Sequence, residues 1–391
     1  MSLRFLTAGE SHGPVLLVIL EGLPAGLPLT TALVNQELSR RQQGMGAGPR
    51  MKLEQDKVQI LGGVLAGHTT GAPLAMSIEN QDHERWRGKS VPPLTIPRPG
   101  HADLSGALKY GYRDLRSSLE RASARETASR VAVGAVCKDL LSQFNIQVGG
   151  FVSAIGEIRA DLEEIPLLER PDRAEQSEVR CPHPGFSQEM AQRIRRATQD
   201  KDTLGGVIEI IAWGVPAGLG SYAQWDRRLD ARLGSAVLSI PAIKGVEIGQ
   251  AFENATLPGT QAQDPIRLDG EDLVRTGLRN GGLEGGITTG QVLWLRVAMK
   301  PVASTLTPQL SVDLATGKET LTQYERSDFC PVPRAVPIVE SMVAYVLAEA
   351  LMEKLGGDSL EEMKLRFEAL RRARLSDLPM DTCDHVFWPE A

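Results

Sequence analysis

GLPAGL at residues 22–27 returns as GVPAGL at residues 214–219, and each copy follows an apolar run typical of a β-strand. In both hexapeptides a proline stands between two glycines, which is typical of a turn. Recurrence of a motif with the same preceding element is the mark of a duplicated structural unit. This pair of hexapeptides predicts that the chain is built twice from one plan.

Two further elements recur in the same order. The segment 62–71, GGVLAGHTTG, returns as 281–290, GGLEGGITTG, with every shared glycine and threonine at the same spacing. Each half then supplies one long apolar stretch with helical periodicity, at 123–141 and 335–351. We therefore expect an α+β fold of two similar halves, about 1–150 and 205–355, whose sheets carry helices on one face. The alternative, that glycine-rich hairpins resemble one another without duplication, stays open.

Composition limits the possible functions. The 391 residues carry a net charge of −6, which disfavours nucleic-acid binding because such proteins need a basic surface. The four cysteines lie far apart and suggest neither a disulfide framework nor a metal site. No signal peptide or membrane-spanning stretch is recognisable, so we expect a cytoplasmic protein without membrane contact.

Two segments show no recognisable chemistry. Residues 155–205 are charged and contain four prolines, which favours a solvated excursion between the halves. Residues 356–391 begin as an amphipathic helix and end in an irregular tail. We expect a single domain over 1–355, followed by this C-terminal helix and tail.

The stretch 98–130 is the richest in arginine. Its basic residues are Arg98, Lys109, Arg113, Arg116, Arg121, Arg125 and Arg130, against Asp103, Asp114, Glu120 and Glu126. Ser123-Ala124-Arg125-Glu126 has the pattern of a capping box, which predicts a helix start with Arg121 and Arg125 beside it. Cations at a helix N-terminus are unfavourable unless an anion joins them, so we expect a phosphate or carboxylate site there. A solvated basic helix start is the alternative.

Other arginines lie in comparable positions. In the second half, Arg326 and Arg334 flank Asp328 just before the 335–351 helix. Arg40 and Arg41 end a helix that follows Thr30, where the helix dipole alone could explain them. Arg50 follows the glycine-rich loop 44–48, whose backbone could approach a ligand closely.

Two histidines lie in glycine-bounded turns: His12 in GESHG, residues 9–13, and His101 in RPGHAD, residues 98–103. A loop histidine is suited to proton transfer near neutral pH. GESHG also matches the GxSxG pattern of serine hydrolases, but only eight residues precede it, too few for the strands that such a nucleophile elbow needs. The loop 44–48 lacks the full dinucleotide-binding pattern. A non-catalytic binding module would not explain the two histidines.

Taken together, five segments resemble the chorismate synthase family. They are GESHG (9–13), RPGHAD (98–103), RASARETASRVAVGA (121–135), SIPAIKGVEIG (239–249) and RSDFCPVPRAVPIVES (326–341). The resemblance runs from Leu3 to about Leu351. It implies a β-α-β sandwich assembled as a homotetramer. It also implies a lyase that converts 5-enolpyruvylshikimate 3-phosphate to chorismate and phosphate by 1,4-anti elimination, with reduced FMN and no net redox change.

The resemblance also implies residue roles. His101 would protonate the departing phosphate, His12 would protonate or stabilise the reduced flavin, and Asp328 would help flavin nitrogen 5 to act as a base. The residues expected to hold the substrate anions are Ser11, Arg41, Arg50, Arg98, Arg125 and Arg326. Those expected to hold FMN are Arg121, Ala122, Ser123, Pro241, Ala242, Gly285, Lys300, Pro301, Val302, Ala303, Ser304 and Arg326.

The chain departs from the family pattern at one position. The family loop reads GYGRG, whereas residues 44–48 read GMGAG, so Ala47 stands where an arginine is expected. Loss of a charge-assisted bond costs roughly 1.5 to 3 kcal/mol if nothing replaces it. Arg50 or Arg40 could compensate. No nucleotide motif shows whether the chain reduces its flavin with NADPH, and an external flavin reductase is the default expectation.

Overall fold

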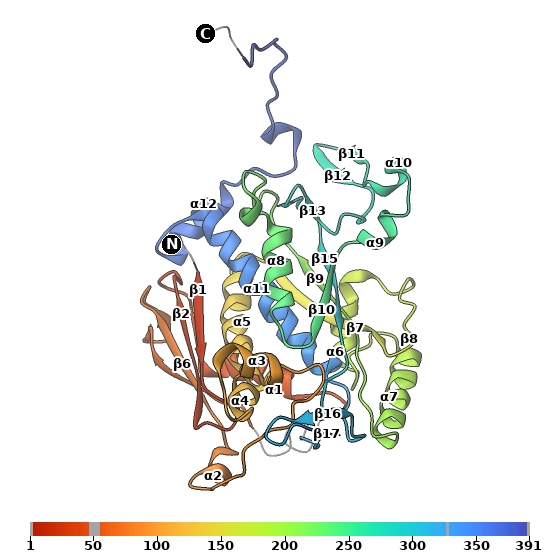
Figure 1. The fold of residues 1–391 in the computed structure, drawn as a ribbon. Helices are drawn as coiled ribbons and strands as arrows, with labels where there is room; N and C mark the ends of the chain where they lie inside the picture. Colours follow the sequence, from red (N-terminus) through yellow and green to blue (C-terminus); the bar gives the residue numbers. More distant parts are fainter. Residues whose placement is uncertain (1–2, 47–54, 326–327, 389–391) are drawn as a thin grey trace.

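The computed structural model describes residues 3–46, 55–325 and 328–388. Two antiparallel sheets face each other across a layer of helices (Figure 1). The first sheet has the order β1-β2-β6-β3, with bounds Arg4–Ala8, Val15–Glu21, Leu74–Glu79 and Val58–Gly62. The second has the order β10-β15-β9-β7-β8, with bounds Ile243–Ile248, Leu293–Met299, Gly206–Trp213, Gln147–Ile155 and Ile158–Arg159. The expected β-α-β sandwich is confirmed.

The duplication is visible in the strand order. The succession β1-β2-β6-β3 of the first sheet matches β7-β9-β15-β10 of the second. The hexapeptide turns are tied down identically: Thr69 Oγ1 donates to the carbonyl of Pro24, and Thr288 Oγ1 donates to the carbonyl of Pro216. The second unit therefore begins with β7, upstream of residue 205. The division into a domain of residues 1–355 and a tail of 356–391 remains a prediction.

The helical layer contains four main helices. They are α1 (Thr31–Gln42), α5 (Thr127–Ser142), α8 (Leu229–Leu238) and α11 (Val332–Leu355). Helix α5 packs on the first sheet and α11 on the second, and the two helices pack on each other. Helix α11 is long and apolar enough to cross a membrane, but 20 of its 24 residues are buried inside the fold, as in a core helix. Its burial explains its apolar composition.

The closest contact between α5 and α11 occurs at Gly134. A Cβ atom added there would lie 2.1 Å from the Cβ of Ser341. Nearby, the fully buried Glu340 of α11 receives bonds from Arg40 of α1 and Lys138 of α5. Gly134 thus lets α5 and α11 approach closely, and the Glu340 carboxylate joins α11 to α1 and α5. A buried carboxylate is tolerated only when it is paired, so Glu340 requires both cations.

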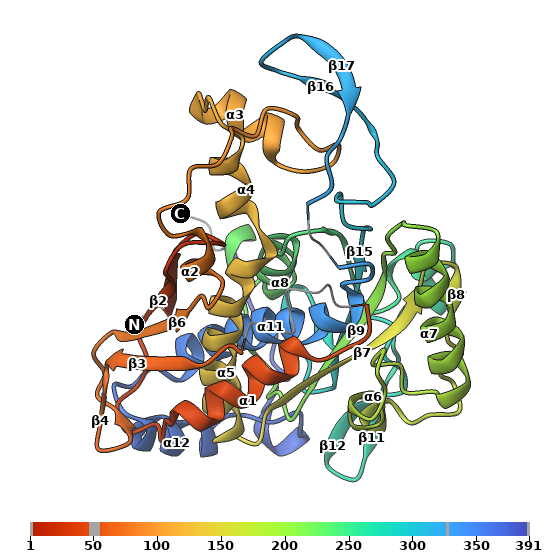
Figure 2. The same ribbon diagram turned by 90° about the horizontal axis from the view of Figure 1, so that it is seen from below.

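The remaining helices and turns lie in the connections. Their bounds are α2 His83–Trp86, α3 Asp103–Tyr110, α4 Arg116–Ala122, η2 Ala124–Glu126, η3 Leu167–Glu169, α6 Arg170–Glu175, α7 Pro184–Gln199, η4 Trp225–Arg227, α9 Ala251–Asn254, α10 Gly259–Ala262, α12 Leu360–Glu368 and η5 Leu375–Asp377. The small hairpins are β4 Val64–Leu65 with β5 His68–Thr69, β11 Ile266–Asp269 with β12 Asp272–Arg275, β13 Leu283–Glu284 with β14 Ile287–Thr288, and β16 Leu310–Asp313 with β17 Lys318–Leu321. Hairpin β16–β17 and α3 project from the sandwich (Figure 2).

Two local predictions are wrong. Ser123 accepts a hydrogen bond from the backbone N–H of Arg125 and caps the short 3₁₀ turn η2, while the Glu126 carboxylate binds Arg130 and Thr7 instead of closing a capping box. The prediction that segment 155–205 is a solvated excursion is also wrong. Its residues Leu162, Ile165 and Ala174 are buried against Phe151 and Ile211, so part of the segment covers the outer face of the second sheet.

The contact at Gly134 generates a stability prediction. Gly134→Ala should lower the free energy of unfolding by about 1 to 3 kcal/mol, because the added methyl group must push α5 and α11 apart. Gly234→Ala in α8 is the matched control, since a Cβ there meets nothing within 4 Å and alanine is the better helix former. Denaturant unfolding of both variants measures the difference. Equal stability of the two would contradict the close helix contact.

Candidate functional site

A cavity of about 320 Å³ opens where the two halves meet. Its walls come from the β1–β2 turn, the segment 98–101, helix α4 with turn η2, the segment 299–304 and the start of α11. An adjoining hollow of about 430 Å³ shares six lining residues with it. The two cavities therefore form one continuous depression, within the size range of small-molecule sites.

Most of the predicted site residues line this depression. Those in the 320 Å³ cavity are Ser11, His12, Arg41, Arg98, His101, Ala122, Ser123, Arg125, Pro241, Ala242, Lys300, Val302, Ala303, Ser304 and Asp328. Arg121 lines the adjoining hollow. Pro301 and Gly285 line neither cavity, and Gly285 lies in the turn of hairpin β13–β14. Arg50, Arg326 and Ala47 lie outside the described residues.

A buried carboxylate, Asp56, holds two of the predicted arginines. Its Oδ2 accepts from Arg41 at 3.3 Å, and its Oδ1 accepts a short bond from Arg125. All three residues are at least 93% buried. One negative charge thus faces two guanidinium groups at the floor of the cavity, which leaves the trio with a net positive charge.

Backbone and neutral side-chain partners fix the orientation of both guanidinium groups. Arg41 donates to the hydroxyl of Thr127 and the carbonyl of Ala124. Arg125 donates to Asn80 Oδ1 at 2.7 Å. Because planar guanidinium groups bind carboxylate and phosphate through fixed forks, this arrangement is preorganised for an anion.

The floor is electrostatically strained. Burial lowers the pKa of Arg41 to about 10, the Asp56 carboxylate opposes that effect, and the like charges of Arg334 and Arg125 add to it. Arg41 remains charged at neutral pH. An anion bound among these groups would relieve both the repulsion and the loss of hydration.

His12 is held by a carboxylate of α4. Its Nδ1 lies 2.7 Å from Glu120 Oε1, and its backbone N–H donates to Glu120 Oε2 at 2.7 Å. The ring of Trp86 packs at 4.6 Å between centroids. Burial alone would raise the pKa of Glu120, but the bonds from His12 lower it below its ordinary value overall. An ionised Glu120 fixes a proton on His12 Nδ1, so Nε2 is the nitrogen through which this ring exchanges protons.

His101 is held in the same way. Its Nδ1 lies 2.6 Å from Asp103 Oδ1, and Arg98 binds the same carboxylate through Nε and Nη2 at 2.8 and 3.0 Å. Burial would raise the pKa of Asp103, but the bonds from His101 and Arg98 hold it well below its ordinary range. Arg98 also donates to the hydroxyl of Ser304 at 2.9 Å, which joins the histidine loop to the segment 299–304.

The wall around Ala242 is apolar with one cationic edge. Ala242 has a φ of +69°, an uncommon value for alanine that the surrounding structure must impose. Its carbonyl accepts from the backbone N–H of Lys300, whose Nζ donates to the carbonyl of Gly100 at 2.6 Å. Met299 and Val302 complete this surface.

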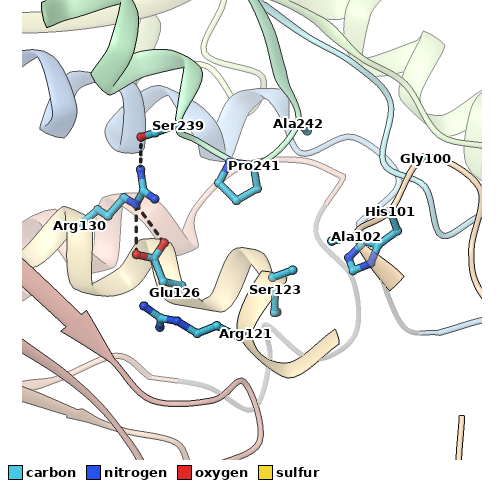
Figure 3. A pocket seen from close by; sticks show the side chains of 11 residues that line it. Gly100, His101, Ala102, Arg121, Ser123, Glu126, Arg130, Ser239, Pro241 and Ala242 are labelled. Atoms are coloured by element: carbon cyan, nitrogen blue, oxygen red, sulfur yellow. Dashed lines mark hydrogen bonds and ion pairs between the residues drawn. The ribbon is translucent and has the colours of Figure 1, made fainter. Parts of the chain in front are cut away.

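The adjoining hollow carries its own cations (Figure 3). Arg130 binds Glu126 and the hydroxyl of Ser239, and these bonds connect α5 with the end of α8. Arg121 donates to the carbonyls of Thr7 and Gly9. Both guanidinium groups are oriented by the fold.

Sequence reasoning missed the groups that orient the predicted residues. Asp56, Asn80, Glu120 and Trp86 carried no recognised motif. From the sequence, Asp103 and Glu120 are recognisable only as charges that offset nearby arginines. The detectable signal for Asp103 was its spacing of two from His101, within reach of the same turn. Arg40 cannot compensate for Ala47, because it binds Glu37, Glu175 and Glu340 and lines neither cavity.

The serine-hydrolase alternative is not supported by the fold. GESHG lies in the connection between the antiparallel strands β1 and β2, whereas a nucleophile elbow joins a strand to a helix. Among residues 3–46, 55–325 and 328–388, no group of three or more His, Cys, Asp or Glu side chains could hold a metal ion. Burial raises the pKa of Cys181 to about 11 and of Cys330 to about 12, so these thiols are poor nucleophiles.

Comparisons with known proteins agree with this geometry. A family profile described as "Chorismate synthase" matches residues 3–352. The chorismate synthase of Aquifex aeolicus is 51% identical over 386 residues, covering 94% of this chain and 96% of that protein. That of Desulforudis audaxviator is 50% identical over 371 residues, covering 92% and 95%. A crystal structure of chorismate synthase superposes with a TM-score of 0.79 at 44% identity, covering 94% of this chain and 97% of that one. The chain therefore belongs to the chorismate synthase family, carbon–oxygen lyases of the shikimate pathway that act on a phosphorylated substrate.

Proposed function

We propose that this cavity converts 5-enolpyruvylshikimate 3-phosphate to chorismate and phosphate by 1,4-anti elimination, with reduced FMN as cofactor and no net redox change. The observation that carries the proposal is that two carboxylate-held histidines line one cavity together with Arg41 and Arg125, the two arginines that Asp56 holds. Elimination of phosphate needs a cationic receptor for the leaving group and a positioned acid, and both are present.

The Arg41–Asp56–Arg125 trio is the proposed receptor for the phosphate. A phosphate monoester carries up to two negative charges at neutral pH, and charge increases on it as the carbon–oxygen bond breaks. Guanidinium groups already oriented by Thr127 and Asn80 need no rearrangement to stabilise that charge. Ser11, which is 98% buried beside Ser123, lies in the same cavity and can donate to the same anion.

The contacts of the two histidine loops favour a division of their roles. The loop of His12 is tied to the phosphate receptor, because Asn80 donates to the carbonyls of Glu10 and Gly13 and accepts from Arg125. We therefore assign His12 Nε2 to protonation of the departing phosphate. The loop of His101 is tied to Ser304 and Lys300, so His101 faces the surface expected to hold the cofactor. The family resemblance suggested the reverse division.

The wall formed by Pro241, Ala242, Met299, Lys300 and residues 302–304 fits FMN. A flat isoalloxazine ring requires an apolar surface, which Met299, Val302 and Ala303 supply, and its phosphate requires cations, which Lys300 and Arg121 supply nearby. Reduced FMN held there would supply electron density that assists departure of the allylic phosphate and loss of the hydrogen on carbon 6, without net oxidation. Asp328, which lines the same cavity, would orient the cofactor's reactive edge.

The first sheet provides a surface for the expected homotetramer. Its outer face exposes Leu6, Leu17 and Ile19, whereas the equivalent face of the second sheet is covered around Ile211 by residues 160–175. We propose that copies of the chain associate through the exposed face, which sedimentation of Ile19→Lys against the parent protein tests. An external flavin reductase and a cytoplasmic location remain expectations.

The proposed activity has a direct test. Under anaerobic conditions, the purified protein with reduced FMN and 5-enolpyruvylshikimate 3-phosphate should release chorismate and phosphate in equal amounts. Chorismate absorbance and a phosphate assay follow both products. Absence of turnover with cofactor and substrate bound would refute the proposal.

The histidine roles generate a further prediction. His12→Ala and His101→Ala should each lower kcat roughly 10² to 10⁴-fold, the range for lost acid–base catalysis. Glu120→Gln and Asp103→Asn should lower kcat less, since they only misorient the rings. His68→Ala, on the exposed β4–β5 hairpin, is the matched control and should retain full activity.

Titration of reduced FMN separates the two histidines. His101→Ala should weaken FMN binding or change its absorbance spectrum, whereas His12→Ala should leave both unchanged. The opposite pattern would restore the division suggested by the family resemblance, and full activity of both variants would remove the proton-transfer roles altogether.

A further inference from the structure

A third buried arginine, Arg334, lines the cavity without an assigned role. It lies in the first turn of α11 and is 93% buried. Its Nη1 donates a short bond to Asp328 Oδ2, and its Nε donates to the backbone carbonyl of Arg41 at 3.3 Å. It therefore belongs to the same wall as Asp328 and stands directly beside the Arg41–Asp56–Arg125 trio.

Burial of this guanidinium is costly in three respects. The guanidinium group of Arg334 is withdrawn from water. It also lies near the like charge of Arg41, and this repulsion adds to burial, the main cause of the lowered pKa of Arg41. A cation in the first turn of a helix also opposes the helix dipole. A bound anion beside Arg334 would offset all three costs, as it would for Arg41.

Arg334 differs from the neighbouring Arg40 in its access to the cavity. Arg40 bonds to three carboxylates, Glu37, Glu175 and Glu340, and lines neither cavity. Arg334 lies in the cavity wall, where a ligand can reach it. The two neighbouring arginines thus have different environments.

The local charges indicate which anion fits. In the described part of the chain, Arg41 and Arg125 share one carboxylate, so the trio retains a positive charge suited to a phosphate dianion. Arg334 is matched by Asp328 and suits a weaker, singly charged group. The proposed substrate carries one phosphate and two carboxylates. We propose that Arg334 holds a carboxylate of the substrate while Arg41 and Arg125 hold its phosphate. This assignment rests on the proposed function.

Steady-state kinetics of Arg334→Ala test the assignment, with inorganic phosphate as a product inhibitor. Arg334→Ala should raise KM for the substrate roughly 10- to 100-fold, the range for a lost charge-assisted bond. It should leave the inhibition constant of phosphate within about 3-fold, because that constant depends on the trio. Arg125→Ala should raise both constants. Arg334→Lys keeps the charge without the fork and should recover part of the loss.

Each other outcome overturns the assignment. An unchanged KM in Arg334→Ala means that Arg334 does not touch the substrate. An equal rise of KM and of the phosphate inhibition constant places it on the phosphate. A lower kcat with unchanged KM, matching Asp328→Ala, makes Arg334 a positioning residue for that carboxylate.

Arg334→Met, which keeps most of the side-chain volume, replaces Arg334→Ala if the alanine variant has a lowered Tm. Absence of turnover in the parent protein refutes the proposed function itself.

Discussion

The site depends on the buried carboxylate of Asp56, which binds Arg41 and Arg125 at once. Two guanidinium groups taken out of water beside each other would repel strongly, and a single carboxylate between them makes the arrangement tolerable without neutralising it. The remaining positive charge is what a phosphorylated substrate requires. Removing Asp56 would take away the carboxylate that the two buried guanidinium groups share. The same ion pairs therefore stabilise the floor of the cavity and hold both arginines in place for an anion.

Duplication explains why the floor of the cavity lies between the two structural units. Arg41 ends α1 and Arg125 belongs to the turn that starts α5, both in the first unit, whereas Arg334 starts α11 of the second. The close packing of α5 against α11 at Gly134 brings the starts of these helices to one seam. Neither unit alone could assemble the cavity, because its apolar wall comes from residues 299–304 and its histidines from residues 12 and 101.

The duplication and several cavity residues could be predicted from the sequence, because short local motifs indicate them. The repeated hexapeptides at 22–27 and 214–219 predict the duplication, and their tethering by Thr69 and Thr288 confirms it. The family motifs contain Arg98, Arg125, His12 and His101, and all four line one cavity. Arg41, which also lines this cavity, stands outside the five motif segments.

Apart from Asp103, which lies two residues from His101, the orienting partners could not be predicted, since no local pattern connects them with the residues they hold. Glu120 is 108 residues from His12, and Asp56 is 69 residues from Arg125. The capping box failed because Glu126 finds Arg130 and Thr7 once the chain has folded. The burial of segment 155–205 could not be predicted, because its few apolar residues, such as Leu162 and Ile165, stand among many charged ones.

A crystal structure of the protein with FMN and 5-enolpyruvylshikimate 3-phosphate bound tests the central claim most directly. We expect phosphate oxygens about 2.7 to 2.9 Å from guanidinium nitrogens of both Arg41 and Arg125, with Asp56 still between them. A phosphate bound elsewhere in the cavity, with these two arginines in contact only with protein groups, would contradict it.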